Sequence, residues 1–183
     1  ICNMSIEGGA RCGYINPDEK TFNYIKNKLC APKSENWDKA LLWWKSLKSN
    51  EDSIYDDVVK LDASKVEPTV TWGITPGQSI SINQQIPSLN DLSSNDQSVA
   101  EEAYEYMGFR PGQTIKDTPV DVCFIGSCTN GRISDLRIAA KVLRNKKISK
   151  NVKAFVVPGS EKVAAEATQE GLDKIFKESG FQW

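Results

Sequence analysis

The chain has 183 residues, of which 39% are apolar and 26% are charged, a composition typical of globular proteins. Its 23 lysines and arginines are balanced by 24 acidic residues, and the net charge of −1 offers no basic surface for nucleic acid and no polybasic membrane signal. The longest apolar run, residues 40–44, is far shorter than the roughly 20 residues that span a bilayer. We therefore expect one ordinary domain or two small ones, binding neither nucleic acid nor membranes.

The sequence contains no histidine, which removes the commonest general base and the commonest metal ligand. Sites of the Ser-His, Cys-His and His-metal types cannot be built from these residues alone. The first residue is isoleucine, and the residues after it lack the charged start and apolar centre of a signal peptide. We expect the chain to be a fragment of a longer protein.

Five cysteines are spread widely along the chain, and no two of them form a Cys-x-x-Cys pair. They are Cys2, Cys12, Cys30, Cys123 and Cys128. An odd number at such spacing favours neither a disulfide framework nor a complete zinc site. The expectation is reduced thiols in a cytoplasmic protein.

Two helices are predicted in the first quarter of the chain. Residues 16–19 are typical of a helix start, with Asn16 as the N-cap and Pro17 at the first helical position. That helix is expected to run to about Lys28. Residues 37–47 predict a second helix, because apolar side chains recur three and four positions apart. Its tryptophan-rich stripe favours core packing over a ligand platform.

The middle of the chain is less regular. Residues 54–61 and 69–73 are predicted as short strands, because β-branched and aromatic residues are frequent in them. Residues 74–96 are polar and contain many serines and asparagines, which is typical of a functional loop or an interdomain connection. A short helix is predicted at residues 97–107, ended by Gly108.

The last third of the chain predicts a β-α-β-α unit, the signature of a parallel sheet covered by helices. The predicted strands are residues 120–126 and 152–157, and the predicted helices are residues 133–143 and 161–178. A right-handed crossover brings the turns that follow both strands to the carboxyl edge of the sheet. Ligands of open α/β sheets bind at that edge, so residues 127–132 and 158–160 are expected to face one site.

The turn after the first of these strands allows two chemical interpretations. Gly126 and Gly131 have the spacing of a phosphate loop, but Arg132 and Ile133 stand where Lys and Ser or Thr are needed. Alternatively, Cys128 at a helix N-terminus would have a lowered pKa and would be a good metal ligand or nucleophile. A loop thiol without a function is the third possibility.

Four stretches of the sequence together resemble the aconitase superfamily over essentially the whole chain. They are residues 1–11, 69–73, 124–130 and 157–160. The most specific are the Gly-Ser-Cys-Thr-Asn sequence after a buried strand and the N-terminal Ile-Cys-Asn-Met. The Thr-Trp-Gly sequence and residues 132–137 favour the isopropylmalate branch over aconitase itself, and homoaconitase is the alternative branch.

The resemblance implies an α/β fold of layered domains, with parallel sheets covered by helices. Residues 1–117 would form the C-terminal part of one domain with a connection, and residues 118–183 would begin a second. The implied activity is that of a hydro-lyase, which isomerises a hydroxy-dicarboxylic acid by removing and re-adding water in leucine biosynthesis. A separate small subunit is the implied partner. A phosphate- or nucleotide-binding module using the turn at Gly126 is the alternative from a different functional class.

The resemblance also implies a 4Fe–4S cluster held by three cysteines. Cys128 matches the first ligand, and the other two are expected beyond Trp183. Asn3 and Glu7 match positions that line the family's active site, Asn3 beside the cluster and Glu7 near the substrate hydroxyl. The chain alone is therefore expected to be inactive.

Three further residues are candidates for contact with the substrate. They are Asn130, Arg132 and Ser160. Each of the candidate active-site and substrate-contact residues also has a purely structural interpretation, such as a surface acid, a polar turn or a helix cap.

Overall fold

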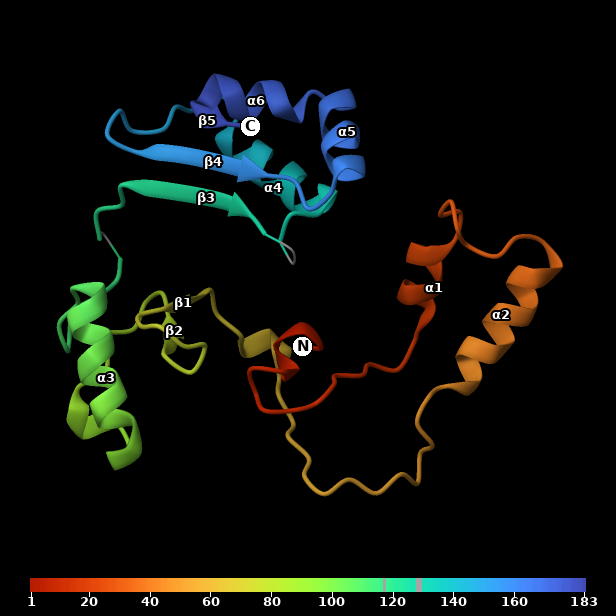
Figure 1. Ribbon diagram of the computed structural model, residues 1–183, viewed down its shortest axis with the longest axis horizontal. Helices are drawn as coiled ribbons and strands as arrows, with labels where there is room; N and C mark the ends of the chain where they lie inside the picture. Colours follow the sequence, from red (N-terminus) through yellow and green to blue (C-terminus); the bar gives the residue numbers. More distant parts are fainter. Residues whose placement is uncertain (117, 128–129) are drawn as a thin grey trace. The chain divides into compact units, whose positions relative to one another are not determined.

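The computed structural model describes residues 1–116, 118–127 and 130–183 (Figure 1). They divide into two compact units, Ile1–Gln113 and Thr114–Trp183, each of which is described by itself. The predicted domain boundary lies between residues 117 and 118. Residue 117 is outside the described residues, and the boundary stays a prediction. No helix in the described part of the chain has the length and apolar character needed to cross a membrane.

The first unit begins with a 3-10 turn, η1 (Asn3–Ser5), followed by helix α1 (Glu19–Ile25). Asp18 is the N-cap of α1, and its Oδ1 accepts a hydrogen bond from the backbone N–H of Thr21 at 3.0 Å. The predicted cap at Asn16 is therefore wrong. The Oδ1 of Asn16 instead accepts a hydrogen bond from the backbone N–H of Ser49 at 3.0 Å, which ties the chain before α1 to the chain after the next helix.

Helix α2 (Glu35–Ser46) carries the predicted tryptophan stripe. The rings of Trp37 and Trp44 meet edge to face at 5.6 Å, and Trp44 stacks on Phe22 of α1 at 6.2 Å. An ion pair between Lys45 and Glu19, at 3.2 Å, joins the same two helices. The stripe thus packs against α1, but α2 has no fully buried residue, so the prediction of core packing is only partly confirmed.

The remaining elements of the first unit are small apart from one helix. They are η2 (Ala63–Lys65), strand β1 (Thr69–Thr71), strand β2 (Ser79–Ser81), η3 (Leu89–Asp91) and helix α3 (Ser94–Met107). Strands β1 and β2 pair antiparallel, and Trp72, directly after β1, stacks on Tyr104 of α3 at 5.3 Å. The predicted structureless stretch at residues 74–96 therefore contains a strand, a 3-10 turn and the start of α3.

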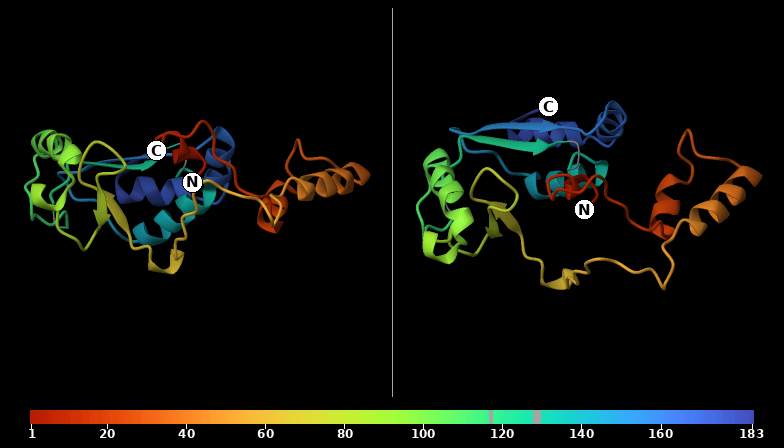
Figure 2. Two further views of the ribbon diagram at one scale, coloured as in Figure 1. Left: turned by 90° about the horizontal axis from the view of Figure 1, so that it is seen from below. Right: turned by 60° about the horizontal axis from the view of Figure 1, so that its bottom comes forward.

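The helix prediction for residues 97–107 is confirmed with a start three residues earlier, at Ser94. Its end is as predicted, because Gly108 adopts the left-handed conformation at φ 67°. In contrast, residues 54–61 form no strand among the described residues. Both figures show the segment between α2 and η2 as an extended chain without a neighbouring strand in the first unit (Figures 1 and 2).

The second unit has the predicted β-α-β-α order with two additions. Its elements are β3 (Val122–Gly126), α4 (Ile133–Leu143), β4 (Lys153–Val157), α5 (Glu161–Gln169), α6 (Leu172–Ser179) and β5 (Phe181–Gln182). The strands are parallel in the order β3-β4-β5. The single helix predicted at residues 161–178 is divided into α5 and α6 because Gly171 between them is left-handed, with φ 74°.

The core of the second unit lies between the sheet and its helices. Leu136 of α4, Val156 of β4 and Phe176 of α6 are fully buried there. The opposite face of the sheet is open among the described residues, and Val122 and Phe124 of β3 are exposed on it. The prediction that residues 120–126 form a buried strand is therefore only half right, because alternate side chains point to the uncovered face.

Candidate active site at the carboxyl edge of the parallel sheet

The two turns that the sequence assigned to one edge of the sheet are in contact. Gly126 and Val157, the last residues of β3 and β4, are paired in the parallel register. Beyond them, the backbone N–H of Gly159 donates a hydrogen bond to the carbonyl oxygen of Gly131 at 2.8 Å. The predicted proximity of the turns is thus confirmed for the described residues, which do not include Cys128 and Thr129 of the first turn.

The start of the first turn needs an unusual backbone. Gly126 has φ +142°, and a Cβ at this position would lie 2.4 Å from the carbonyl oxygen of Val157. The next residue, Ser127, has φ +102°, a conformation that residues with a Cβ seldom adopt. Strained conformations of this kind cluster at functional sites. Gly126 therefore serves the close approach of β3 to β4, which explains a glycine here without a phosphate ligand.

Asn130 and Arg132 belong to this turn, directly before α4, and both are exposed. The backbone N–H of Arg132, the N-cap residue, donates to Oδ2 of Asp135 at 3.1 Å. The carboxylate of Asp135 thus caps the helix, and the guanidinium of Arg132 is not needed for that purpose. Substrate contact by either residue stays a prediction.

Ser160 is the N-cap of α5, in the second turn. Its Oγ accepts a hydrogen bond from the backbone N–H of Val163 at 3.2 Å. The hydroxyl hydrogen remains available as a donor. The capping role, which was the structural alternative for Ser160, is therefore present, and a substrate contact stays a prediction beside it.

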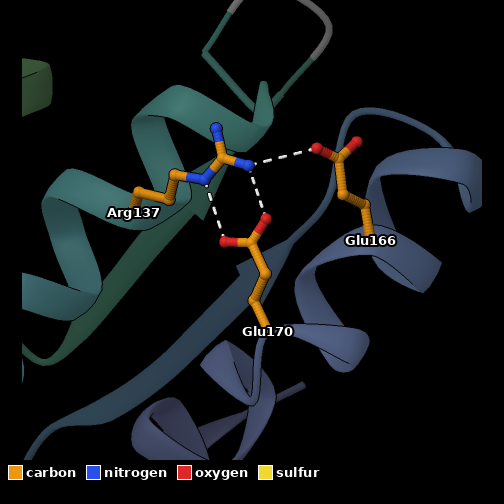
Figure 3. Close-up of polar contacts among 3 residues, drawn as sticks. All are labelled: Arg137, Glu166 and Glu170. Carbon is orange, nitrogen blue, oxygen red and sulfur yellow. Dashed lines mark hydrogen bonds and ion pairs between the residues drawn. The ribbon is translucent and has the colours of Figure 1, made fainter.

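An ion-pair network joins the helices that follow the two turns (Figure 3). Arg137 of α4 donates from Nε to Glu170, which follows α5, at 2.9 Å and from Nη2 to Glu166 of α5 at 3.1 Å. A second bond from Nη2 makes the contact with Glu170 bidentate. Hydrogen bonding to Arg137 lowers the pKa of Glu170, and the same contact raises the pKa of Arg137.

Sequence reasoning missed this network. The available signal was the spacing of Glu166 and Glu170, four residues apart and therefore neighbours on a helix surface. The partner could not be found by spacing, because Arg137 is 29 and 33 residues away from the two acids. The network joins the first half of α4 to the C-terminal end of α5, away from the turn that precedes α5.

Asn3 and Glu7 belong to the first unit and are exposed. The chain around them is coiled, since the N–H of Gly8 donates to the carbonyl of Met4 at 3.2 Å and that of Ala10 to the carbonyl of Ser5 at 2.9 Å. These bonds hold residues 3–10 in a series of tight turns that begins with η1. Nothing in this geometry tests the predicted roles of Asn3 and Glu7, which stay predictions.

A cleft of about 580 Å³ in the first unit contains none of these residues. It lies beside the loop between α1 and α2, and Lys26, Lys28, Lys33 and Trp37 are among the residues that line it. Its lysines are exposed, and it has no buried polar group of its own. The cleft is therefore not the site that the sequence predicted.

A family model for the aconitase family (aconitate hydratase) matches residues 1–183. The chain belongs to the aconitase family. The resemblance found in the sequence and the α/β fold class are thereby confirmed.

Curated relatives of this aconitase-family chain share one name. The chain is 86% identical over 183 residues to the large subunit of 3-isopropylmalate dehydratase from Prochlorococcus marinus strain AS9601. It is 61% identical over the same length to the large subunit of that name from Nostoc punctiforme. Each match covers 100% of this chain and 39% of the relative. The chain thus spans about two-fifths of the length of the curated relatives it matches.

Membership of the aconitase family implies an iron–sulfur cluster. The described residues contain no group of three or more metal-ligating side chains. Cys2, Cys12 and Cys30 are exposed in the first unit, and Cys123 is half-buried on β3, where it packs against the core. The fifth cysteine, Cys128, comes after β3 in the sequence and lies outside the described residues. The described cysteines therefore do not form a complete cluster site by themselves, and the role of Cys128 as a ligand stays a prediction.

Proposed function

We propose that the chain is part of the large subunit of a 3-isopropylmalate dehydratase. The complete enzyme would interconvert 2-isopropylmalate and 3-isopropylmalate by removing water and adding it back, in leucine biosynthesis in the cytoplasm. The observation that carries the proposal is the 86% identity, over the whole chain, to a relative of that name. The partner would be the separate small subunit of the dehydratase.

Cys128 would be one of three cysteines that hold a 4Fe–4S cluster, with the other two supplied by residues outside this chain. When bound, such a cluster supplies an iron with an open coordination position, a Lewis acid for the departing hydroxyl group. The turn after β3 suits this role because Gly126 and Ser127 redirect the chain sharply at the end of the strand. The contact between Gly131 and Gly159 then supports the turn from the side.

The other candidate residues would bind the substrate and move protons. The carboxylate of Glu7 would accept the proton that leaves the substrate, or return it. The amide of Asn3 would orient that carboxylate by hydrogen bonding. The exposed guanidinium of Arg132 would bind a substrate carboxylate, because Arg pairs with carboxylates in a bidentate geometry. Asn130 and the hydroxyl hydrogen of Ser160 would add neutral hydrogen bonds.

Two matched variants of the complete large subunit test the central claim. Cys128→Ser should abolish binding of iron and sulfide during anaerobic purification, and with it the conversion of isopropylmalate in the presence of the small subunit. Cys123→Ser is the control, because Cys123 packs in the core of the second unit rather than in the turn. It should keep the cluster and lose only some stability. A cluster that survives in Cys128→Ser would refute the ligand assignment.

A further inference from the structure

The segment between α2 and η2 exposes large apolar side chains to an unusual degree. Five of the eight residues at positions 54–61 are large and apolar, and all five are exposed. Their exposed fractions are 98% for Ile54, 58% for Tyr55, 61% for Val58, 85% for Val59 and 79% for Leu61. Contiguous apolar surface of this kind is typical of an interaction site.

The backbone of the same segment is unpaired as well. Among the described residues, no backbone-to-backbone hydrogen bond involves positions 54–61. The single bond to the segment's main chain comes from its own side chains, since the N–H of Val58 donates to Oδ1 of Asp57 at 2.8 Å. Buried backbone N–H and C=O groups in folded proteins nearly always have partners, so burial of this segment would require pairing with another chain segment.

The side chains specify the kind of partner. In a strand, Val58 would point to one face of a sheet, and Val59 would point to the other. Val59 and Leu61 would lie on the same face, whereas Val58 would share the other face with Lys60. One apolar face beside a mixed face is typical of a strand that packs its apolar face on a hydrophobic core.

We propose that residues 57–61 form a strand of a sheet in the complete large subunit, and that the neighbouring strand comes from the part of the same polypeptide outside residues 1–183. The chain corresponds to only 39% of the length of its curated relatives, so a partner strand is available within one molecule. A tethered partner has a high effective concentration and pairs ahead of a free one. An unpaired strand of this length would otherwise promote association between molecules.

Hydrogen–deuterium exchange of the complete large subunit, without the small subunit, tests the proposal. The amides of residues 58–61 should exchange at least about a hundredfold more slowly than in an unstructured peptide, at any protein concentration. Exchange at the unstructured rate would overturn the proposal. Protection that appears only when the small subunit is added, or that increases with concentration, would overturn it in favour of a partner in trans or a second copy.

Variants of the complete subunit separate the two faces. Val59→Asp should lower the melting temperature by several degrees, because it places an unpaired charge on the apolar face, and Val58→Asp, on the face that carries Lys60, should lower it less. Asn50→Asp adds the same charge in the exposed turn before the segment and should leave the melting temperature unchanged. If both valine variants melt like the Asn50→Asp control, the segment is not buried in the complete subunit.

Discussion

Glu7 is proposed to take part in proton transfer, and the part of the chain that the structure describes offers no structural role for its carboxylate. It is exposed in the coil at the start of the chain, and no ion pair or hydrogen bond of its carboxylate is present among the described residues. An acid in such a position contributes little to folding, because even a surface ion pair is worth less than about 1 kcal/mol. A role in proton transfer would explain it better.

The variant Glu7→Gln in the complete enzyme tests that role. It keeps the shape of the side chain and removes the charge, so we expect normal folding, a full iron and sulfide content, and a turnover number reduced about a hundredfold. Steady-state kinetics together with iron analysis is the measurement. Turnover close to that of the unchanged enzyme would return Glu7 to the surface-acid interpretation.

Gly126 is required by the backbone rather than by chemistry. Alanine at this position would meet the carbonyl oxygen of Val157 and would hold φ near +142°, where a Cβ is strained. We expect Gly126→Ala to lower the free energy of unfolding by at least about 2 kcal/mol, measured by urea denaturation followed by circular dichroism. Gly77→Ala is the control, because its Cβ would meet nothing closer than 3.8 Å. Equal stability of the two variants would contradict the packing argument.

At the scale of single residues, sequence reasoning worked where a local rule acts alone. Gly108 ends α3 as predicted, because a left-handed position after a helix favours glycine. The cap of α1 was misplaced because Asn16 and Asp18 are both good caps, and the choice between them depends on Ser49, which is 33 residues away. The site residues named from the resemblance keep their standing as predictions.

At the scale of elements, the contact of Arg137 on α4 with Glu170 after α5 predicts that the stability of the folded state depends on pH. The pKa of Glu170 is held below its ordinary value of 4.5 by the hydrogen bond from Arg137. The folded state is therefore stabilised above pH 4.5, and this stabilisation is lost as the pH falls through the lowered pKa. The network is exposed, so high salt should weaken it.

Glu170→Gln should accordingly lower the melting temperature at neutral pH, and the difference from the unchanged chain should vanish in strongly acid solution. Thermal melts across a pH series measure it. Glu178→Gln, which removes the same charge from α6, should show no comparable difference. A Glu170→Gln deficit that persists unchanged in acid would mean that the ion pair is not its cause.

Elements with strong periodicity were predicted well, and those that depend on a partner were not. The β-α-β-α order of the second unit followed from alternating apolar runs and helical spacing. Strand β2 was missed because Ser79–Ser81 is polar and is held by pairing with β1, which no local pattern reveals. Residues 54–61 show the reverse case, a strand pattern that lacks a partner in the described chain.

At the scale of the whole molecule, the chain consists of two units and spans 39% of the length of its curated relatives. The two candidate groups lie in different units, with Asn3 and Glu7 in the first and Asn130, Arg132 and Ser160 in the second. The proposed function would also require further cysteines and a small subunit, which residues 1–183 do not supply. We therefore expect each unit to carry parts of the machinery that have no activity separately.

The uncovered face of the second unit's sheet affects how the isolated chain behaves in solution. Strand β3 is an edge of the sheet among the described residues, and it presents Val122 and Phe124 on a face that no described helix of this unit covers. Exposed apolar edge strands pair with one another, so the chain produced alone should form concentration-dependent assemblies. Sedimentation velocity should show Phe124→Lys reducing this association, whereas Ile138→Lys, at an exposed apolar position on α4, should not. The face that would be interior in the complete subunit would thus limit the concentration at which this chain by itself stays free of association.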